Sequence, residues 1–444
     1  MILAICFTNF GPYHLARLRA LALRMAERGD RLLAYEVAGS QRLYPWQTAR
    51  AEEPFEWATL YPDRALESLP RGAASGAIRR ALERDRPDAV AIVGYSRPES
   101  TAALGWARRS GRPTILMSES QEIDHPRVWW KEAVKRRRVR LCSAGLVGGE
   151  RHRAYLVSLG MPRDRIALGY NAVDNAHYAR RAEAARNLPD GRVGLPSGPY
   201  FLAVNRFAPE KNLPTLIRAF ARYRATAPGD AWDLVLCGGG PGAAEVEDAI
   251  GRVGLGRAIH RPGFLQAGEL SRWYGFASAF VHPSLSEPWG LVVNEAAACG
   301  LPLLVSDRAG CVETLVPDPP GTTGVRFDPR DEEALAAHLG WMARLPATER
   351  VAMGRRAAVV VAEWGPETFA EGTLQALQMA IGDGRMGSVT DPPLSPREKV
   401  AGTAGRGSPD PGVSSSRAGP RSQRESPHPP LRGTFSRGEK GSTL

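Results

Sequence analysis

The chain has 444 residues, of which 43% are hydrophobic and 24% charged, and its formal net charge is +11. This length exceeds one ordinary domain and the composition excludes disorder over most of the chain, so we expect two domains. The positive charge favours anionic partners, namely nucleotide phosphates or an anionic membrane. Because no recognition motif accompanies the charge, nucleic acid is not expected as a partner.

Short apolar segments alternate with longer amphipathic ones in the first half of the chain. The first, Ile2–Phe7, follows no cationic run and ends too early for a signal peptide, so we expect a buried strand. This alternation predicts βαβ units and a parallel sheet. The other strands expected are Leu32–Val37, Ala89–Gly94, Thr114–Met117 and Ala144–Val147, with helices at Pro12–Arg28, Glu99–Ser110 and Glu150–Leu159.

The composition changes around Ala182–Pro199, where Gly and Pro punctuate the chain as in a linker. A helix is expected near Asn212, which can cap it, with Pro214 in its first turn. From about Gly384 the chain is rich in Pro, Gly, Ser and Arg, a composition that cannot bury enough apolar surface to fold. Strands of a second α/β series are expected at Phe201–Val204, Leu234–Cys237, Ala279–His282 and Leu303–Ser306.

Five cysteines are spread along the chain without a C-x-x-C pair or a His at ligand spacing. This pattern favours reduced thiols in the cytoplasm over disulfides or a zinc site, so no metal is expected. The chain has no apolar run of about 18 residues, so we expect no membrane span, although contact with a membrane surface stays open.

The segment Ser284–Gly300 holds the most informative pattern. A strand is expected to end at His282, and a helix is expected to begin near Gly290, where backbone amides and the helix dipole attract phosphate oxygens. Glu287 precedes this helix and Glu295 lies on it, and carboxylates accept hydrogen bonds from sugar and ribose hydroxyls. Two glutamates with this spacing could equally face solvent.

A second pattern follows the strand Phe201–Val204. Arg206 comes directly after the strand and Lys211 just before the next helix, which places two cations at the carboxyl edge of a parallel sheet. Such a pair can bind a diphosphate without a metal, or Arg206 could form an exposed ion pair with Glu210. The run Leu236–Gly242 adds glycines, including Gly239 and Gly240, that let backbone approach a ligand.

With these three segments in this order, the second half resembles glycosyltransferase family 4, retaining enzymes with the GT-B fold of two Rossmann-like domains facing a cleft. Glu287 and Glu295 match its Glu-x7-Glu motif, and the likeness covers roughly residues 200–366. It implies that Arg206 and Lys211 bind the donor diphosphate, Glu295 the ribose and Glu287 the sugar. It also implies donor contacts from Trp289, Gly290, Leu291, Gly239, Gly240, Gly310 and, beside the base, Phe264.

Composition and the resemblance together set the expected domains at 1–182 (acceptor side), 183–199 (linker) and 200–365 (donor side). It adds a closing helix at 366–383, before a disordered tail at 384–444.

In the first half the resemblance is looser. Gly11, Tyr13 and His14 follow the first strand, where family members bring a loop toward the donor phosphates, although a single His there could equally be structural. Many members carry a His after the fourth strand; here Glu119 stands at that place and could accept a sugar hydroxyl.

A further segment, Arg127–Arg140, packs seven cations around two tryptophans. Such a helix can lie on an anionic membrane, but it could equally be a solvated helix or a patch for an anionic saccharide.

The function expected is retaining transfer of a hexose from a UDP- or GDP-linked sugar to a hydroxyl of a saccharide or lipid-linked acceptor, without a cofactor. The protein is expected in the cytoplasm, as a soluble or peripheral membrane enzyme. A sugar-nucleotide epimerase and a non-catalytic nucleotide-sugar-binding protein are the alternatives. An epimerase would form product from the donor alone, whereas a binding protein would never consume the donor.

Overall fold

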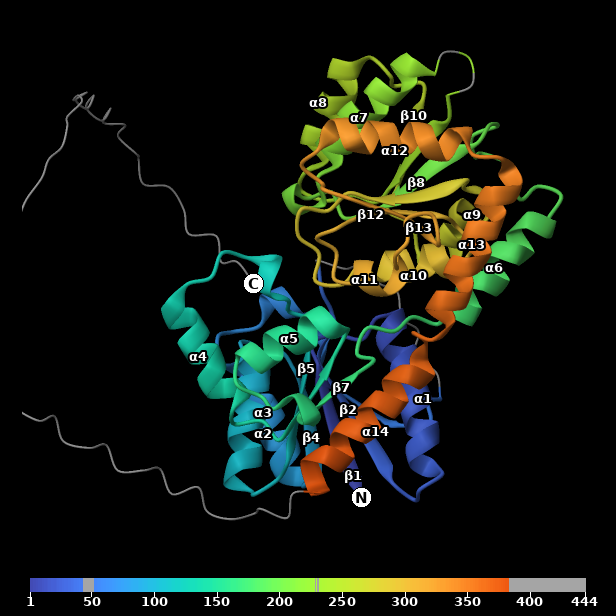
Figure 1. Cartoon of the computed structure of the whole chain (residues 1–444). Helices are drawn as coiled ribbons and strands as arrows, with labels where there is room; N and C mark the ends of the chain where they lie inside the picture. Colours follow the sequence, from blue (N-terminus) through green and yellow to red (C-terminus); the bar gives the residue numbers. More distant parts are fainter. Residues whose placement is uncertain (43–51, 228, 230, 383–444) are drawn as a thin grey trace, which may run out of the picture. The chain divides into compact units, whose positions relative to one another are not determined.

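The computed structural model describes residues 1–42, 52–227, 229 and 231–382 (Figure 1). The tail predicted at 384–444 lies outside them. Both sheets in the described part pair their strands only in parallel, which confirms the prediction of a parallel doubly wound architecture.

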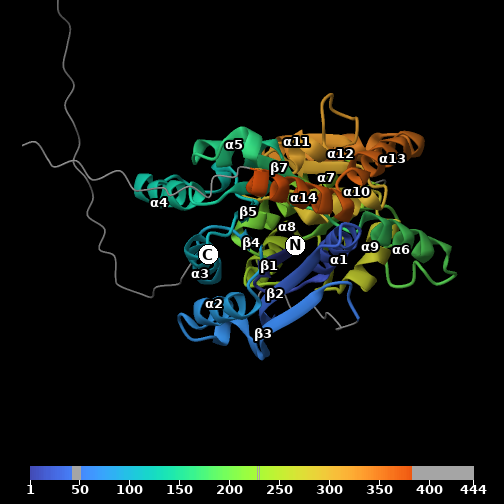
Figure 2. The same cartoon turned by 90° about the horizontal axis from the view of Figure 1, so that it is seen from below.

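Over the described residues, the first sheet has seven strands in the order β3-β2-β1-β4-β5-β6-β7, and Figure 2 shows this order from β3 through β5. The order turns back between β1 and β4, so the chain winds outward in both directions from these two strands. The strands are β1 (Ile2–Phe7), β2 (Arg31–Ser40), β3 (Glu56–Ala65), β4 (Ala89–Val93), β5 (Thr114–Ser118), β6 (Ala144–Val147) and β7 (Ile166–Leu168).

The second sheet repeats this winding with six strands in the described residues, in the order β10-β9-β8-β11-β12-β13. Its order turns back between β8 and β11. The strands are β8 (Tyr200–Val204), β9 (Asp233–Cys237), β10 (Ile259–Gly263), β11 (Ala279–His282), β12 (Leu303–Ser306) and β13 (Gly324–Phe327).

Helices cover both faces of each sheet because successive strand residues point to opposite faces and both sets are apolar. On β1, Leu3 and Ile5 join the core under α1 and α14, whereas Ala4 and Cys6 join the core under α2 and α3. The helices around the first sheet are α1 (Pro12–Ala26), α2 (Ala73–Asp85), α3 (Pro98–Arg109), α4 (Trp129–Val139), α5 (Glu150–Ser158) and α14 (Pro366–Gly382).

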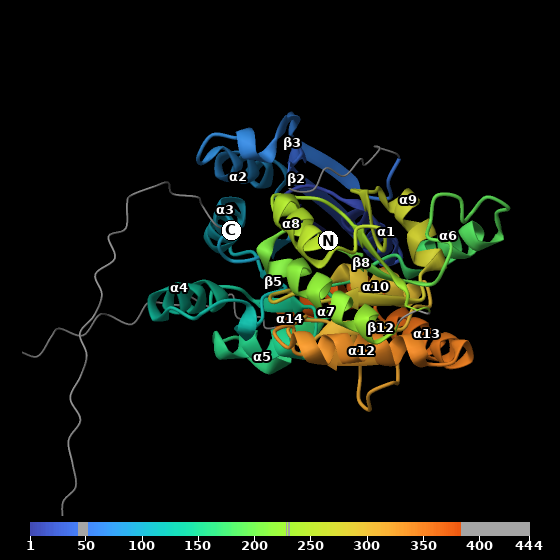
Figure 3. The same cartoon turned by 90° about the horizontal axis from the view of Figure 1, so that it is seen from above.

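The second sheet has the same layered arrangement. One face packs against α7, α8 and α12, which Figure 3 shows together in the foreground, and the other against α6, α9, α10 and α13. These helices are α6 (Asn175–Asn187), α7 (Leu213–Thr226), α8 (Ala243–Val253), α9 (Ala267–Phe276), α10 (Leu291–Ala298), α11 (Val312–Leu315), α12 (Glu332–Arg344) and α13 (Ala347–Ala362). Among the described helices, none combines the length and hydropathy needed to span a bilayer.

Helix α6 crosses the boundary expected at 182/183. Its Tyr178 and Ala182 are buried in the core of the second sheet, so the chain joins the second half before the Gly- and Pro-rich segment begins. Conversely, α14 returns to the first half, where Phe369 and Leu377 pack with the helix α1. The apolar faces of these two helices decide which sheet each one covers, and the composition of the Gly- and Pro-rich segment does not mark the boundary between the halves.

The helix predicted near Asn212 is confirmed as α7, but the Asn212 side chain does not cap it. Asn212 stands at the N-cap position with φ +57°, and no cap hydrogen bond forms from its side chain. Its amide instead donates to the Pro283 carbonyl at 3.2 Å and the Pro329 carbonyl at 2.7 Å. Burial explains the difference, because an amide in the interior bonds whichever carbonyls face it.

Candidate active site

The predicted phosphate-binding residues lie where the strand order of the second sheet turns back. Doubly wound folds bind ligands at the carboxyl ends of the strands on either side of such a turn. Arg206 and Lys211 lie on the loop after β8, and Glu287 lies on the loop after β11, the neighbouring strand. The fold thus brings together residues that are far apart in the sequence.

Lys211 and Glu287 form a buried ion pair at the centre of this site. The Lys211 ammonium donates to Oε2 of Glu287 at 2.5 Å, and the same oxygen accepts a hydrogen bond from Nε2 of His282 at 2.9 Å. Burial alone raises the pKa of Glu287, but the charge of Lys211 and the bond from His282 outweigh it and lower the pKa to about 2. Glu287 is therefore ionised at any physiological pH.

Arg206 lies beside the glycine-rich loop and forms an ion pair with Glu210, the alternative that the sequence left open. Gly240 has φ +144°, and a Cβ there would lie 2.7 Å from the Phe207 carbonyl oxygen and 3.1 Å from Cγ of Arg206. The Phe207 amide donates to the Gly239 carbonyl at 2.7 Å. The glycines thus let this loop pack directly onto the segment that carries Arg206.

Helix α10 begins directly after Gly290, next to the ion pair. Gly290 has φ +101°, a conformation that favours glycine, and a Cβ there would lie 3.3 Å from Cγ of Glu287. The first helical residue, Leu291, is partly exposed. Amides in a first helical turn have no partner within the helix, so those at Gly290 and Leu291 are suited to an anion.

The Trp289 side chain joins the two halves of the protein. It is buried, donates to Oδ1 of Asn294 at 2.9 Å, and lies against Gly148 and Gly149 of the first half. A Cβ on Gly148 would lie 2.8 Å from the indole ring. The indole is therefore a packing element, and only the backbone of Trp289 can serve the predicted donor contact.

Glu295 is fully buried and its carboxylate is surrounded by tyrosine hydroxyls. One oxygen accepts from Tyr13, at the start of α1 in the first half, and the other from Tyr274 at 2.8 Å. Burial raises the pKa of Glu295 to about 7, although hydrogen bonds from Tyr13, Tyr274 and Tyr178 oppose it. A ribose at Glu295 would have to compete with these hydroxyls, so its predicted ribose contact stays a prediction.

The remaining candidates of the first half take different positions. Nδ1 of His14 accepts the Gly11 amide at 3.0 Å, and burial, then Arg17, lower the pKa of His14 to about 3. A neutral imidazole that caps the start of α1 favours the structural alternative for His14. Glu119 is exposed at the end of β5 and accepts a hydrogen bond from the Asn171 amide at 2.9 Å.

The two other donor-side candidates frame the site. Phe264 follows the carboxyl end of β10 and is 44% exposed, as an aromatic surface for a base would be. Gly310 donates its amide to the Glu287 carbonyl at 3.0 Å, and a Cβ there would lie 1.8 Å from the Pro288 carbonyl oxygen. Glycine at 310 thus allows two backbone segments to meet under Glu287.

Sequence reasoning missed several side chains that hold this site. His282 could have been noticed, because it ends β11 and stands five residues before Glu287. Gln121 gave no signal; its amide crosses from the first half to donate to the carbonyls of Glu287 and Arg308 at 2.9 and 3.0 Å. Asn205 is also buried, and within the described residues neither polar atom of its side chain has a hydrogen-bond partner.

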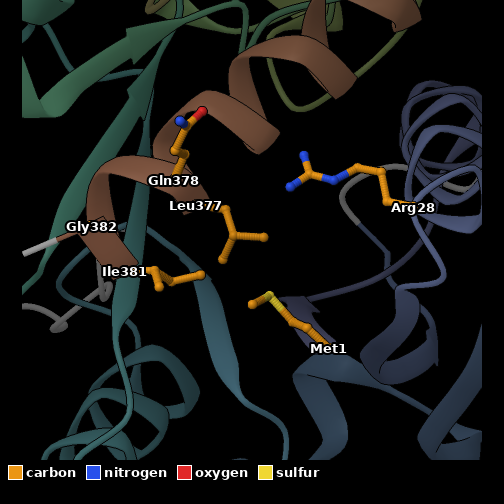
Figure 4. A pocket seen from close by; sticks show the side chains of 6 residues that line it. All are labelled: Met1, Arg28, Leu377, Gln378, Ile381 and Gly382. Atoms are coloured by element: carbon orange, nitrogen blue, oxygen red, sulfur yellow. The ribbon is translucent and has the colours of Figure 1, made fainter. Parts of the chain in front are cut away.

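Two cavities lie away from these residues. One of about 340 Å³ is at the amino edge of the first sheet, opposite the edge where doubly wound folds bind ligands. The other, of about 530 Å³, includes Arg19, Asp174 and Glu367 in its lining. The first is lined by Met1, Arg28, Leu377, Gln378, Ile381 and Gly382 (Figure 4).

The described residues hold no group of three or more His, Cys, Asp or Glu side chains arranged to bind a metal ion.

Comparison with known proteins finds a family model that covers the second-half residues of this site. Residues 193–359 match the model of the family described as Glycosyl transferases group 1. A GDP-mannose-dependent alpha-(1-6)-phosphatidylinositol monomannoside mannosyltransferase of Mycolicibacterium smegmatis is 28% identical over 175 residues, 38% of this chain and 44% of the relative. A D-inositol 3-phosphate glycosyltransferase of Arthrobacter sp. is 31% identical over 201 residues, 45% and 47% of the two chains. The chain thus spans less than half the length of these relatives.

Solved structures extend the likeness to the whole fold. Sucrose-phosphate synthase from Thermosynechococcus elongatus superimposes with a TM-score of 0.66 at 20% sequence identity, over 86% of this chain and 99% of that one. At this identity the likeness concerns the fold alone, and it confirms the predicted GT-B architecture. The chain therefore carries a domain of the Glycosyl transferases group 1 family at residues 193–359, within a GT-B fold.

Proposed function

We propose that this protein is a retaining glycosyltransferase that moves a hexose from a nucleoside diphosphate sugar to a hydroxyl of a saccharide or lipid-linked acceptor. The observation that carries the proposal is the contact between Lys211 and Glu287, which are 76 positions apart and meet where the strand order turns back. The name of one relative, dependent on GDP-mannose, supports a nucleotide-sugar donor, and the name of the other supports glycosyl transfer.

The proposed chemistry rests on stabilising the leaving group. Arg206 and Lys211 would neutralise the negative charge that develops on the diphosphate as the sugar departs. Both cations have carboxylate partners, Glu210 and Glu287, which keep them in place. We propose that these cations and the amides at the start of α10 suffice without a divalent metal, and that Glu287 orients Lys211 and the sugar.

The acceptor hydroxyl would approach from the first half of the protein. In the proposed front-face displacement, the acceptor oxygen bonds the sugar carbon as its bond to the diphosphate breaks, and the hydroxyl proton passes to the departing phosphate oxygen. Positioning and phosphate stabilisation do most of the catalytic work, so a protein base is not required. Five free cysteines, four of them buried, are consistent with our proposal that the enzyme acts in the reducing cytoplasm.

A panel of UDP- and GDP-sugars tests this function. Release of the nucleoside diphosphate would be followed in EDTA, with and without a membrane lipid extract as the source of acceptor. Release that requires the extract would support a transferase and identify the donor. Conversion of a donor sugar without any acceptor would favour an epimerase, and tight donor binding without turnover would favour a binding protein.

Lys211→Ala should lower turnover by about 10²–10³-fold, because it removes one charge partner of the leaving group. Arg218→Ala is the matched control: Arg218 is a cation on α7 of the same half, exposed and paired with Glu332. Equal turnover in the two variants would contradict the role of Lys211.

A further inference from the structure

We propose that helix α4 docks the protein on an anionic lipid surface and so presents a membrane-borne acceptor to the site. This inference extends the proposed function, because it names the class of acceptor. Figures 1 to 3 show α4 at the margin of the helices that surround the first sheet.

One side of α4 holds the helix to the protein. Lys135 donates to Glu132 at 2.7 Å and to the Tyr155 hydroxyl at 3.0 Å, and Arg138 donates to the Tyr95 carbonyl at 2.7 Å. Val139 is buried in the core beside α2, α3 and α5. The only acidic residue of the helix, Glu132, is thus held on the protein-facing side.

The opposite side of α4 is apolar in its first turns. Trp129 is 82% exposed, Trp130 52% and Val134 45%. Large apolar side chains exposed side by side on one helix face mark an interaction surface, since a protein otherwise tends to bury them. Tryptophan also prefers the boundary between lipid and water, where its ring is half buried and its N–H stays hydrated.

The same exposed side becomes cationic toward the end of the helix. Arg136, Arg137 and Arg140 are exposed, as is Lys131 in the first turn. Within the part of the chain that the structure describes, none of these four cations forms an ion pair. This surface has two tryptophans at one end and arginines at the other, which suits a membrane, where acyl chains lie beside anionic headgroups. A polynucleotide would pair with the arginines but would offer no apolar layer into which the tryptophans could insert.

The loop before α4 connects this surface with the proposed active site. The Gln121 amide donates to the Glu287 carbonyl at 2.9 Å, and Ser286 donates to the Asp124 carbonyl at 3.1 Å. Only a few residues of chain then separate Asp124 from Trp129. A lipid-linked acceptor held at α4 would therefore be delivered at the edge of the first half that touches the Glu287 loop.

Vesicle flotation with the full-length protein and no donor tests the inference. We expect binding to phosphatidylcholine vesicles that contain 30% phosphatidylglycerol, weak binding to pure phosphatidylcholine, and release at high salt. Arg136→Gln with Arg137→Gln should weaken binding roughly 30-fold, since each cation near the surface contributes about a fivefold factor. Trp129→Ala with Trp130→Ala should weaken it as well and abolish the blue shift of tryptophan fluorescence.

The matched control is Arg252→Gln with Arg257→Gln, which removes the same charge from exposed positions at the end of α8 and just after it in the second half. Control and wild type should bind alike. Failure of the wild type to bind anionic vesicles, or equal binding by all variants, would overturn the inference. Donor turnover with a soluble acceptor, measured on the same variants, should stay normal whether or not they bind vesicles. Loss of vesicle binding alone is therefore distinct from failure of the proposed function, which would abolish turnover.

Discussion

Glu287 and Glu295 are both buried, yet their surroundings drive their charges in opposite directions. Glu287 meets a lysine ammonium and a histidine N–H, which favour the carboxylate. Among the described residues, the Glu295 carboxylate meets only tyrosine hydroxyls, which are neutral and do not fully offset the cost of burying a charge. Two residues of one motif thus differ in pKa, at about 2 and about 7, because of their partners and not because of their depth.

Glu295→Gln should remove a pH dependence of folding stability. The folded pKa of about 7 lies above the ordinary value of 4.5, so between these values the folded chain binds more protons than the unfolded chain. Glu295 therefore makes stability fall as pH rises from about 4.5 to about 7, by about 3 kcal/mol in total.

Melting temperatures at pH 5 and pH 8 check this. Relative to wild type, Glu295→Gln should gain melting temperature at pH 8 compared with pH 5. Glu349→Gln, at an exposed glutamate on α13, should behave as wild type does. An identical pH dependence in all three proteins would show that Glu295 does not titrate in this range.

At the scale of elements, the position of the Glu287 loop depends on how the loops after the strands pack together, more than on the strands themselves. Loops after β6 and β11 meet at Gly148 and Trp289, and His152 at the start of α5 donates to the Pro288 carbonyl at 2.7 Å. Since Nδ1 of His152 accepts the Gly149 amide at 3.2 Å, the proton stands on Nε2, toward Pro288. Glycine at 148 and neutral imidazole at 152 together seat the Glu287 loop against the first half.

Gly148→Ala should destabilise the protein by about 1–3 kcal/mol, the usual cost of overpacking a filled interior. The new Cβ would lie 2.5 Å from Oδ1 of Asn171 and 2.8 Å from the Trp289 ring. Thermal melting measures the loss, and donor turnover should fall with it because the Glu287 loop must move. Gly251→Ala on α8, where no atom lies within 4 Å, should be neutral or stabilising. Equal melting temperatures for both variants would contradict this account.

At the scale of the whole protein, the two halves meet through the carboxyl edges of their sheets. Tyr13 bonds Glu295, Gln121 bonds the Glu287 carbonyl, and Arg151 pairs with Glu313 at 2.7 Å. Each contact joins a loop or the start of a helix in the first half to a residue at or near the proposed donor site. Donor binding and contact between the halves are therefore expected to be coupled.

A nucleoside diphosphate should stabilise the folded protein as a whole. A ligand at 100 times its Kd raises the free energy of unfolding by about 2.7 kcal/mol when it binds only the folded state. UDP or GDP, whichever base the site accepts, should raise the melting temperature of wild type and of Arg218→Ala, but much less that of Lys211→Ala. No shift with either nucleotide would contradict a diphosphate site at Lys211.

The local sequence pattern was enough to predict the inner strands of both sheets, because inner strands are buried on both faces and appear as uninterrupted apolar runs. It also predicted the segments that carry Arg206, Lys211, Glu287 and Glu295. The strands that escaped prediction, β3, β7, β10 and β13, are the edges of the two sheets. An edge strand is covered on fewer sides, so its composition is less apolar, and β10 even contains a proline.

Only the tertiary structure decided which side chains and carbonyls each site residue contacts. Nothing in the sequence near Glu295 indicates Tyr13, which stands 282 positions away, and nothing near Glu287 indicates Gln121, 166 positions away. The sequence likewise cannot show which cations of α4 face the protein and which face solvent. Motifs determine which chemical groups are available, whereas burial and the partners across the two sheets set their charge, and both arise only when the chain has folded.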